Sequence, residues 1–340
     1  MDPLTHGIIG ATAATLRVKN PKLIYVAIAC GLMGGMFPDL DVVIRSAENP
    51  FVSLKYHRHF THALAFVPLG ALIVALFAHF VIFRKVKFKE IYWFCFAGML
   101  FHGPLDTMTS YGTHLFLPFD ESRIAWNTIS IVDPLFTIPI FILVFITRIT
   151  RNRKFSGFAA CWASLYLSFG FYQHHQALDY VKMTAETRGH SIAKISASPS
   201  LGNIFAWRGQ YIHRGRIYVD GHHISPWKPY VFYEGESHPY FIPSDKLLKR
   251  IGPKQQADLE FFTFFADGWV ADYPTPGGNK IGDMRYAVLP NSITPLWGIE
   301  LFPDKPDSHA GRVGNRQRSD MDMETLWKMV QGKALEQEPK

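Results

Sequence analysis

Long apolar runs fill the first half of the chain, and the second half lacks them. They cover residues 4–16, 23–37, 63–83, 91–105, 129–147 and 157–172, and several carry almost no charge. From about residue 176 onward, charged residues, glycine, proline and aromatic residues alternate instead. The pattern predicts an α+β protein with a polytopic membrane domain of about six helices over residues 1–175. A mainly β domain over residues 176–305 and a polar tail over 306–340 are expected to follow.

The apolar runs differ in length, and this bears on how many cross a membrane. A helix needs about 20 apolar residues to cross, with a lower limit near ~17. The runs 63–83 and 129–147 meet this requirement, whereas 4–16, 23–37 and 91–105 meet it only if their polar ends are counted. Each short run therefore keeps the alternative of a buried or re-entrant helix.

Basic residues between the runs predict the orientation. Three clusters join consecutive runs: Arg17, Lys19 and Lys22; Arg84, Lys85, Lys87 and Lys89; Arg148, Arg151, Arg153 and Lys154. Lys and Arg close to span ends are retained in the cytoplasm, so all three clusters are expected on that side. Threading six spans then places the N-terminus, the 38–62 and 106–128 connections and everything after residue 176 on the extracytoplasmic side. The first run is expected to be a retained span, because it lacks the basic residues that precede a signal sequence.

Composition narrows the function classes. The chain has 48% hydrophobic residues and a formal net charge of +7. Most basic residues of the first half lie in the three clusters, so the charge argues only weakly for nucleic-acid binding. Cys30, Cys95 and Cys161 all lie in apolar runs, which favours neither a disulfide framework nor a cysteine-based zinc site.

Histidine and aspartate residues gather at the extracytoplasmic ends of the runs. The candidate metal ligands are His6, Asp39, His57, His62, His102 and Asp106. Imidazole and carboxylate without thiolate suit zinc first, and manganese or iron as alternatives. The spacing His102-x-x-x-Asp106 puts both side chains on one face of a helix. One such pair is more often a cap or an anchor, but several segments meeting at one membrane face favour a metal site.

Two residues inside these motifs are candidate catalytic groups. Asp41 is expected to accept a proton from the nucleophilic water, or else to cap the next segment. Arg58 is expected to bind an anionic oxygen with its planar fork of donors, or else to anchor a lipid headgroup. Asp2 and Asp133 are candidates for further contacts with the metal site.

Several motifs together resemble a known family. They are Met1-Asp2-Pro3-Leu4-Thr5-His6-Gly7, Pro38-Asp39-Leu40-Asp41, His57-Arg58-x-x-Thr61-His62, and His102-x-x-x-Asp106 followed by Gly112 and Asp133-Pro134. In this order, over about residues 1–175, they resemble the YdjM-like family of membrane-bound, predicted metal-dependent hydrolases. The resemblance implies a multi-pass protein of the bacterial inner membrane with a metal site, but names no substrate. His59 departs from the expected small residue, and is either an extra ligand or a surface residue.

The pattern of the second half predicts short strands separated by turn residues. Strands are expected at residues 211–213, 216–219, 230–233, 261–265 and 285–289, with a short amphipathic piece near 323–330. Asp283 and Arg285 are expected to form a structural ion pair rather than to reach the metal site. The pairs His174-His175 and His222-His223 are expected to be non-ligands, because adjacent side chains point apart.

Three functions fit these observations. In the first, a metal-bound hydroxide attacks an ester or phosphoester of an amphiphilic lipid or lipid-linked substrate at the bilayer surface. In the second, the metal only clamps the helices of a non-catalytic scaffold or sensor. A transporter is disfavoured, because the polar residues gather at one face instead of lining a path at mid-membrane. An open coordination position would distinguish the enzyme from the scaffold.

Overall fold

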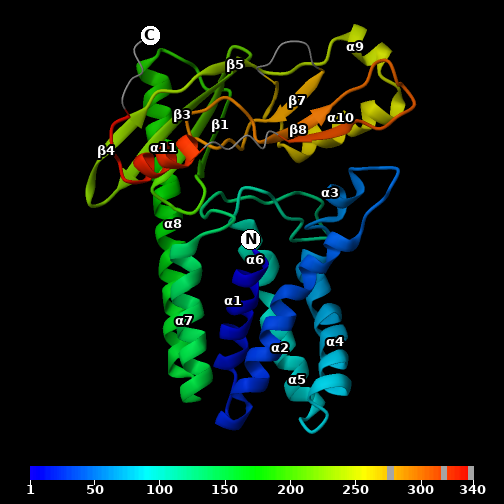
Figure 1. Cartoon of the computed structure of the whole chain (residues 1–340), viewed down its shortest axis with the longest axis vertical. Helices are drawn as coiled ribbons and strands as arrows, with labels where there is room; N and C mark the ends of the chain where they lie inside the picture. The colour runs from blue at the N-terminus through cyan, green and yellow to red at the C-terminus, as the bar shows by residue number, and fades with distance from the viewer. Residues whose placement is uncertain (274–278, 315–319, 336–340) are drawn as a thin grey trace. The chain divides into compact units, whose positions relative to one another are not determined.

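The computed structural model describes residues 1–273, 279–314 and 320–335, and it divides into two compact units (Figure 1). The helical unit comprises Met1–Arg45 and Val52–Phe171. The sheet unit comprises Ser46–Phe51 and Tyr172–Lys340. The helix α8 (Lys154–Thr187) contributes its first half to the helical unit and its second half to the sheet unit.

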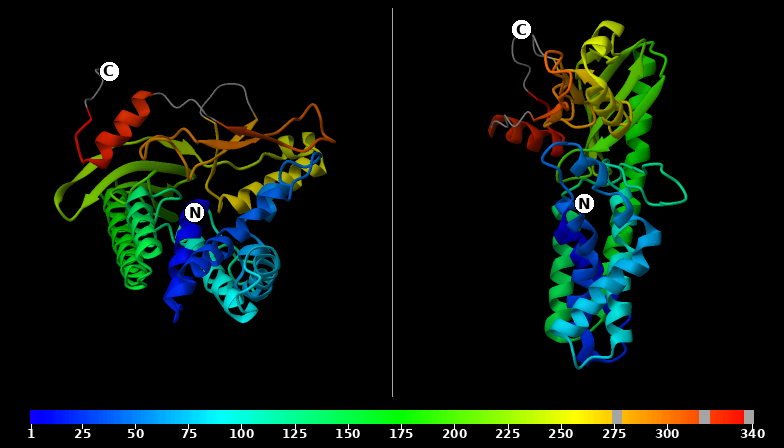
Figure 2. Two further views of the ribbon diagram at one scale, coloured as in Figure 1. Left: turned by 60° about the horizontal axis from the view of Figure 1, so that its bottom comes forward. Right: turned by 90° about the vertical axis from the view of Figure 1, so that its right-hand side faces the viewer.

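Each predicted apolar run forms a helix. The long helices of the helical unit are α1 (Pro3–Leu16), α2 (Ile24–Met36), α4 (Val67–Phe77), α5 (Phe88–Leu100), α7 (Pro134–Thr150) and the start of α8. Shorter pieces connect them: η1 (Pro21–Leu23), η2 (Phe37–Val43), α3 (Val52–Tyr56), η3 (Phe60–His62), η4 (Leu64–Phe66), the π-helical η5 (Ala78–Ile82) and α6 (His102–Thr107). The helix α2 lies side by side with both α1 and α5 (Figure 1, Figure 2).

The structure changes which runs are long enough to span a membrane. Among the described residues, two helical stretches meet the length and composition of a span, Pro21–Val43 and Leu64–Ile82. The first is longer than its apolar run predicts, because η1 and η2 extend α2 at both ends. The run 129–147 was expected to span but is shorter as a helix. Asp133 caps α7, which begins only at Pro134, and leaves an apolar helix of 17 residues.

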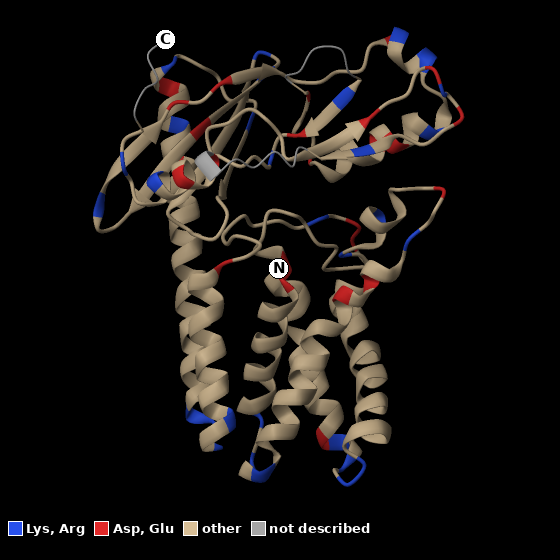
Figure 3. Ribbon diagram, in the orientation of Figure 1, with Lys and Arg blue, Asp and Glu red and all other residues tan. Residues whose placement is uncertain are grey.

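The helical unit exposes large apolar side chains along α4 and α7. Leu69, Ile73 and Phe77 of α4 are 53%, 45% and 56% exposed, and Ile138 and Phe141 of α7 are about half exposed as well. Contiguous apolar surface of this kind is rare on soluble monomers and marks contact with a partner or a membrane. The basic loops 17–22, 84–89 and 148–154 lie together at one end of these helices (Figure 3).

Small residues let α1, α2 and α5 pack backbone to backbone. A Cβ placed on Gly31 of α2 would lie 2.4 Å from the carbonyl oxygen of Gly10 and 2.7 Å from the Cα of Ala11. A Cβ on Gly98 of α5 would lie 2.5 Å from the carbonyl oxygen of Gly31. Close approach of this kind is typical of helices that associate in membranes. It holds together the three helices whose ends carry His6, Asp39 and His102.

The sheet unit contains two antiparallel sheets. The first has the order β1 (Lys194–Pro199), β2 (Ala206–His213), β3 (Arg216–Ser225) and β4 (Lys228–Tyr233), with β5 (Ser237–Pro239) paired to β3. The second has the order β6 (Val270–Asp272), β7 (Lys280–Asp283), β8 (Trp297–Glu300) and β9 (Gly311–Gly314). The helices of this unit are α9 (Asp245–Arg250), α10 (Pro253–Phe265) and α11 (Asp320–Val330). Ile217, Val219, Trp269 and Met284 form a buried core.

Three expectations for the second half need correction. Residues 261–265 form the last turns of α10 instead of a strand, because their aromatic residues continue a helix begun at Pro253. Residues 285–289 lie outside the strands, since β7 ends at Asp283. The expected tail contains β9 as well as α11, which covers the amphipathic piece predicted at 323–330, and Met329 is fully buried. The ion pair is found as expected, with Arg285 Nη2 at 2.7 Å from Asp283 Oδ2.

Candidate metal centre

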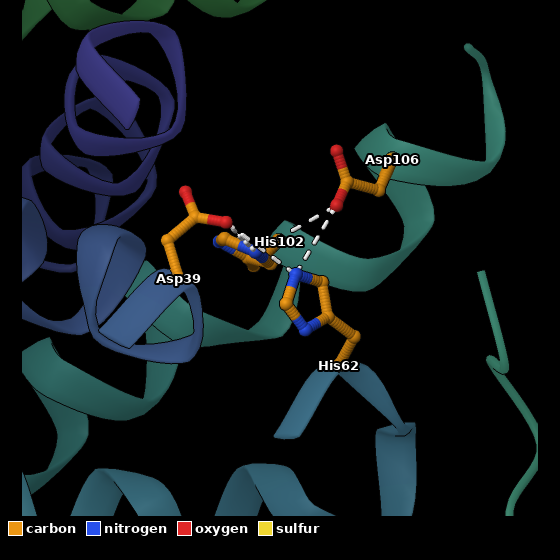
Figure 4. A group of neighbouring side chains, drawn as sticks. All are labelled: Asp39, His62, His102 and Asp106. Carbon is orange, nitrogen blue, oxygen red and sulfur yellow. Dashed lines mark ion pairs between the residues drawn. The ribbon is translucent and has the colours of Figure 1, made fainter. Parts of the chain in front are cut away.

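Four of the predicted ligands converge in the helical unit. Asp39 lies on η2, His62 ends η3, and His102 and Asp106 lie one turn apart on α6 (Figure 4). Each offers one ligand atom, and these atoms all lie within 4.8 Å of one another. The short helix η2 follows the end of α2, η3 precedes the start of α4, and α6 follows the end of α5. The cluster therefore lies at the end of the helical unit opposite the basic loops (Figure 3).

Four distances between the ligand atoms are close to the edge of a coordination tetrahedron. His62 Nε2 lies 3.5 Å from Asp39 Oδ1 and 3.3 Å from Asp106 Oδ2. His102 Nε2 lies 3.6 and 3.8 Å from the same two oxygens. A tetrahedral zinc ion with ligands at ~2.1 Å would separate those ligands by about 3.4 Å. The cluster thus has the dimensions of a site for one ion.

Hydrogen bonds fix the tautomer of His102. Its Nδ1 lies 2.6 Å from the backbone carbonyl oxygen of Gly35, which can only accept a hydrogen bond. The proton of a neutral imidazole is therefore on Nδ1, and the lone pair of Nε2 faces Asp39 and Asp106. A nitrogen lone pair facing two carboxylates is repulsive unless a cation lies between them. Outer partners of this kind commonly orient histidine ligands to metals.

The same reasoning applies to His62. The Thr61 hydroxyl donates to Asp41 Oδ2 at 2.9 Å, so its oxygen is free to accept from His62 Nδ1 at 3.0 Å. Asp41 Oδ2 lies 3.3 Å from the same nitrogen. His62 Nε2 and His102 Nε2 are both buried without a hydrogen-bond partner among the described residues. Both imidazoles therefore present unused nitrogen atoms to the same point.

The charges around the cluster also favour a cation. His62 and Asp106 are buried, whereas the side chain of Asp39 is 14% exposed. Burial alone lowers the pKa of His62, but the carboxylates of Asp106, Asp39 and Asp41 outweigh it and raise the pKa to about 10. The carboxylates thus stabilise positive charge at this position.

His6 lies beside the cluster and contacts one of its ligands. Its Nε2 lies 3.0 Å from Asp106 Oδ1, and its ring stacks on His102 with centroids 3.7 Å apart. The Met1 amino group also contacts Asp106 Oδ1. The predicted ligand His6 is therefore a neighbour of the four-residue cluster rather than one of its members.

His57 and Asp41 form an outer layer around His62. His57 Nδ1 lies 2.8 Å from Asp41 Oδ1, so this predicted ligand contacts Asp41 instead of joining the cluster. Asp41 Oδ2 also accepts from the backbone N–H of Arg58 at 3.1 Å, in addition to the Thr61 hydroxyl. Both Asp41 oxygens are thus occupied. The geometry gives Asp41 a role in holding His62 and its loop.

Arg58 contacts the cluster from the buried side. It is only 3% exposed, and its Nε lies 3.2 Å from Asp106 Oδ2. Its Nη1 donates to Thr109 Oγ1 at 2.9 Å, and its guanidinium lies over the ring of Tyr111. The backbone has a φ of +62°, a conformation that costs a non-glycine residue free energy and is common at functional sites.

The remaining candidates lie elsewhere. Asp2 caps α1 by accepting from the backbone N–H of Thr5, and Asp133 caps α7 by accepting from those of Leu135 and Phe136. Both are helix caps. The ring of His59 lies near that of His114, with centroids 5.0 Å apart, and His59 is not a member of the cluster.

Backbone contacts that sequence motifs do not reveal also shape the centre. The Gly35 carbonyl orients His102, as described above. A Cβ on Gly103 would lie 2.2 Å from the carbonyl oxygen of His62, so only glycine allows α6 to approach η3 this closely. Gly103 lies inside the His102-x-x-x-Asp106 motif, and this position is the feature of the sequence that could have identified it. The role of Gly35 follows only from the packing of α2 against α5.

Comparison with known proteins supports the resemblance. Residues 1–177 match the family described as YdjM inner membrane protein. The match covers more than half of the 340 residues. No curated protein and no solved structure matches the chain.

Proposed function

We propose that this chain, which belongs to the YdjM inner membrane protein family, is a metal-dependent hydrolase. Its substrate is an ester or phosphoester of an amphiphilic lipid or lipid-linked molecule. The observation that supports this best is the pair of imidazole lone pairs, from His62 and His102, that faces the carboxylates of Asp39 and Asp106 at 3.3–3.8 Å. Zinc fits the spacing and the donor types, with manganese and iron as the alternatives.

A bound divalent ion supplies a Lewis acid that polarises a carbonyl or phosphoryl oxygen and lowers the pKa of a coordinated water. The residues of the chain divide the other tasks. Gly35 and Asp41 hold the two histidines in the orientation that ligation requires. Arg58 forms an ion pair with Asp106 through its Nε, and its burial suits a positioning role better than contact with a substrate oxygen.

Asp39 is the residue best placed to accept a proton. Its Oδ1 faces the two histidines, whereas its Oδ2 has no hydrogen-bond partner within the described part of the chain. The Asp39 side chain as a whole is also the most exposed of the four, at 14%. In this proposal the general-base role predicted for Asp41 therefore passes to Asp39.

The orientation of the protein is part of the proposal. The basic loops favour a cytoplasmic position for one end of the helical unit, which places the metal centre at the extracytoplasmic surface of the inner membrane. With the six spans predicted from the apolar runs, the same rule puts the sheet unit on the extracytoplasmic side. A reporter enzyme fused after residue 180 should be active only outside the cytoplasm, and activity only inside would contradict this orientation.

One observation favours a scaffold as the second candidate. Four protein donors are enough to fill a tetrahedral site, and closed sites are typical of structural zinc. Structural zinc sites are usually rich in cysteine, however, and this cluster has two carboxylates and no thiolate. Catalytic zinc can also expand to five ligands during reaction. The donor types and the exposure of Asp39 therefore favour the enzyme.

The deciding experiment combines metal analysis with a substrate screen. The full-length protein, purified in detergent, should contain about one ion per chain, because the four donors form one cluster. It should hydrolyse at least one member of a panel of phospholipids, phosphodiesters and carboxylic esters. Asp106→Ala should lose both the ion and the activity, and the exposed Asp120→Ala should keep both. A metal-loaded native protein that hydrolyses none of the panel would make the scaffold the better explanation.

A further inference from the structure

An apolar groove opens between the two stretches that are long enough to span a membrane. It has a volume of about 500 Å³ and is lined by Met36, Phe37 and Leu40 on one side and by Ile73 and Phe77 of α4 on the other. This volume is within the range of ~300–1,000 Å³ that small-molecule sites occupy. Four of these side chains, Met36, Leu40, Ile73 and Phe77, are 42–56% exposed, so the groove is open along its length.

Two residues that line the groove belong to the same short helix as the metal-centre residue Asp39. Leu40 directly follows Asp39 on η2, and Phe37 precedes it by two residues. Asp39 is also the cluster residue with the most exposed side chain, at 14% compared with 1% or less for the other three. The most exposed member of the metal centre is therefore flanked in the sequence by residues that line the groove.

We propose that this groove holds an acyl chain of a membrane phospholipid, whose ester or phosphoester linkage then lies beside Asp39. Its apolar lining and its position between two membrane-length segments favour hydrocarbon over any polar occupant. Hydrocarbon burial stabilises such a complex by roughly the same amount for each methylene group. The inference rests on the proposed function for the reaction at Asp39, but acyl-chain binding itself requires neither metal nor hydrolysis.

Photolabelling tests the groove directly. The probe is a phosphatidylglycerol with a diazirine in one acyl chain, mixed into detergent micelles with the full-length protein. Peptide mapping should place the adducts within residues 33–40 and 73–77. Ile73→Trp, which fills the groove from an exposed position, should lower this labelling roughly tenfold, as expected when about two methylene groups are expelled. Leu76→Trp is the matched control on the same helix and should label like the native protein.

The outcomes separate this inference from the proposed function. Two outcomes would contradict acyl-chain binding in the groove. One is adducts spread evenly over all exposed apolar helices, and the other is labelling that Ile73→Trp leaves unchanged. The metal-free protein should label as strongly as the metal-loaded protein. Confined labelling without hydrolysis would support the groove and count against the enzyme. Hydrolysis of short-chain esters together with evenly spread labelling would support the enzyme and count against the groove.

Discussion

A buried arginine of the sheet unit and the metal centre of the helical unit differ in whether their buried polar groups have hydrogen-bond partners. In the sheet unit, Arg208 is almost fully buried and donates hydrogen bonds to the carbonyl oxygens of Met284, Pro290 and Ser292. In the helical unit, two histidine nitrogens and two carboxylates face one another at 3.3–3.8 Å. Donors meet acceptors in the first case, whereas in the second the Nε2 atoms of His62 and His102 have no hydrogen-bond partner among the described residues. Buried polar groups therefore do not mark a functional site by themselves. Buried polar groups that meet at one point without hydrogen-bond partners do.

The largest effect on folding stability is expected in the sheet unit. Arg208→Met should lower the free energy of unfolding by about 3–5 kcal/mol, because it leaves two or more buried carbonyl oxygens without donors. Its metal content should not change. Denaturant unfolding in detergent and metal analysis measure the two quantities. Arg250→Ala is the control, since its partner Asp304 is exposed and the pair contributes little. Loss of the metal in Arg208→Met would contradict the independence of the two sites.

The sheet unit should also lose stability in acid because of His222. Burial lowers the pKa of this imidazole to about 4, compared with ~6.5 in an unfolded chain. Between these values the unfolded state binds more protons than the folded state, so stability falls as the pH falls through this window. The loss should approach ~3 kcal/mol at pH 4. His222→Gln should reduce this loss of stability, and His175→Gln, at an exposed position, should not. If stability fell equally with pH in the native protein and in both variants, His222 would not be the cause.

A matched pair of aspartates compares the two units most closely. Asp41 accepts from a histidine and a backbone N–H beside the metal centre, and Asp258 accepts from His309 and the backbone N–H of Ala310 in the sheet unit. Asp41→Asn should lower metal affinity about 10–100-fold, the usual effect of losing an outer partner of a ligand. Asp258→Asn should leave it unchanged. Metal titration measures both, and equal affinities would remove Asp41 from the site.

The smallest effect is expected in the packing that supports the metal centre. Gly31→Ala should lower the free energy of unfolding by about 1–3 kcal/mol, because its Cβ meets the backbone of α1. A Cβ on Gly157 of α8 meets no atom of the described residues within 4 Å. Gly157→Ala should therefore raise stability by about 0.5–1 kcal/mol. A stabilising Gly31→Ala would show that α1 and α2 pack less closely than the structure indicates.

Local patterns were sufficient for the helices and for the donor types. The six apolar runs all form helices, since a long apolar sequence has few other ways to bury its backbone. The strands at 261–265 and 285–289 were predicted wrongly, because aromatic residues suit a strand and a buried helix face equally well. The amphipathic piece predicted at 323–330 does form a helix, but polar composition does not reveal that Met329 is fully buried.

The sequence by itself determined which chemistry the helical unit can hold. It placed histidine and aspartate at one end of the helices and basic residues at the other. Only the tertiary structure decided which of these residues meet. Asp39, His62, His102 and Asp106 come together because glycine backbones bring α1, α2 and α5 into contact. His57, Asp41 and Arg58 take outer positions because each is held by a partner distant in sequence. Such contacts depend on distances between segments, and local patterns carry no record of those distances.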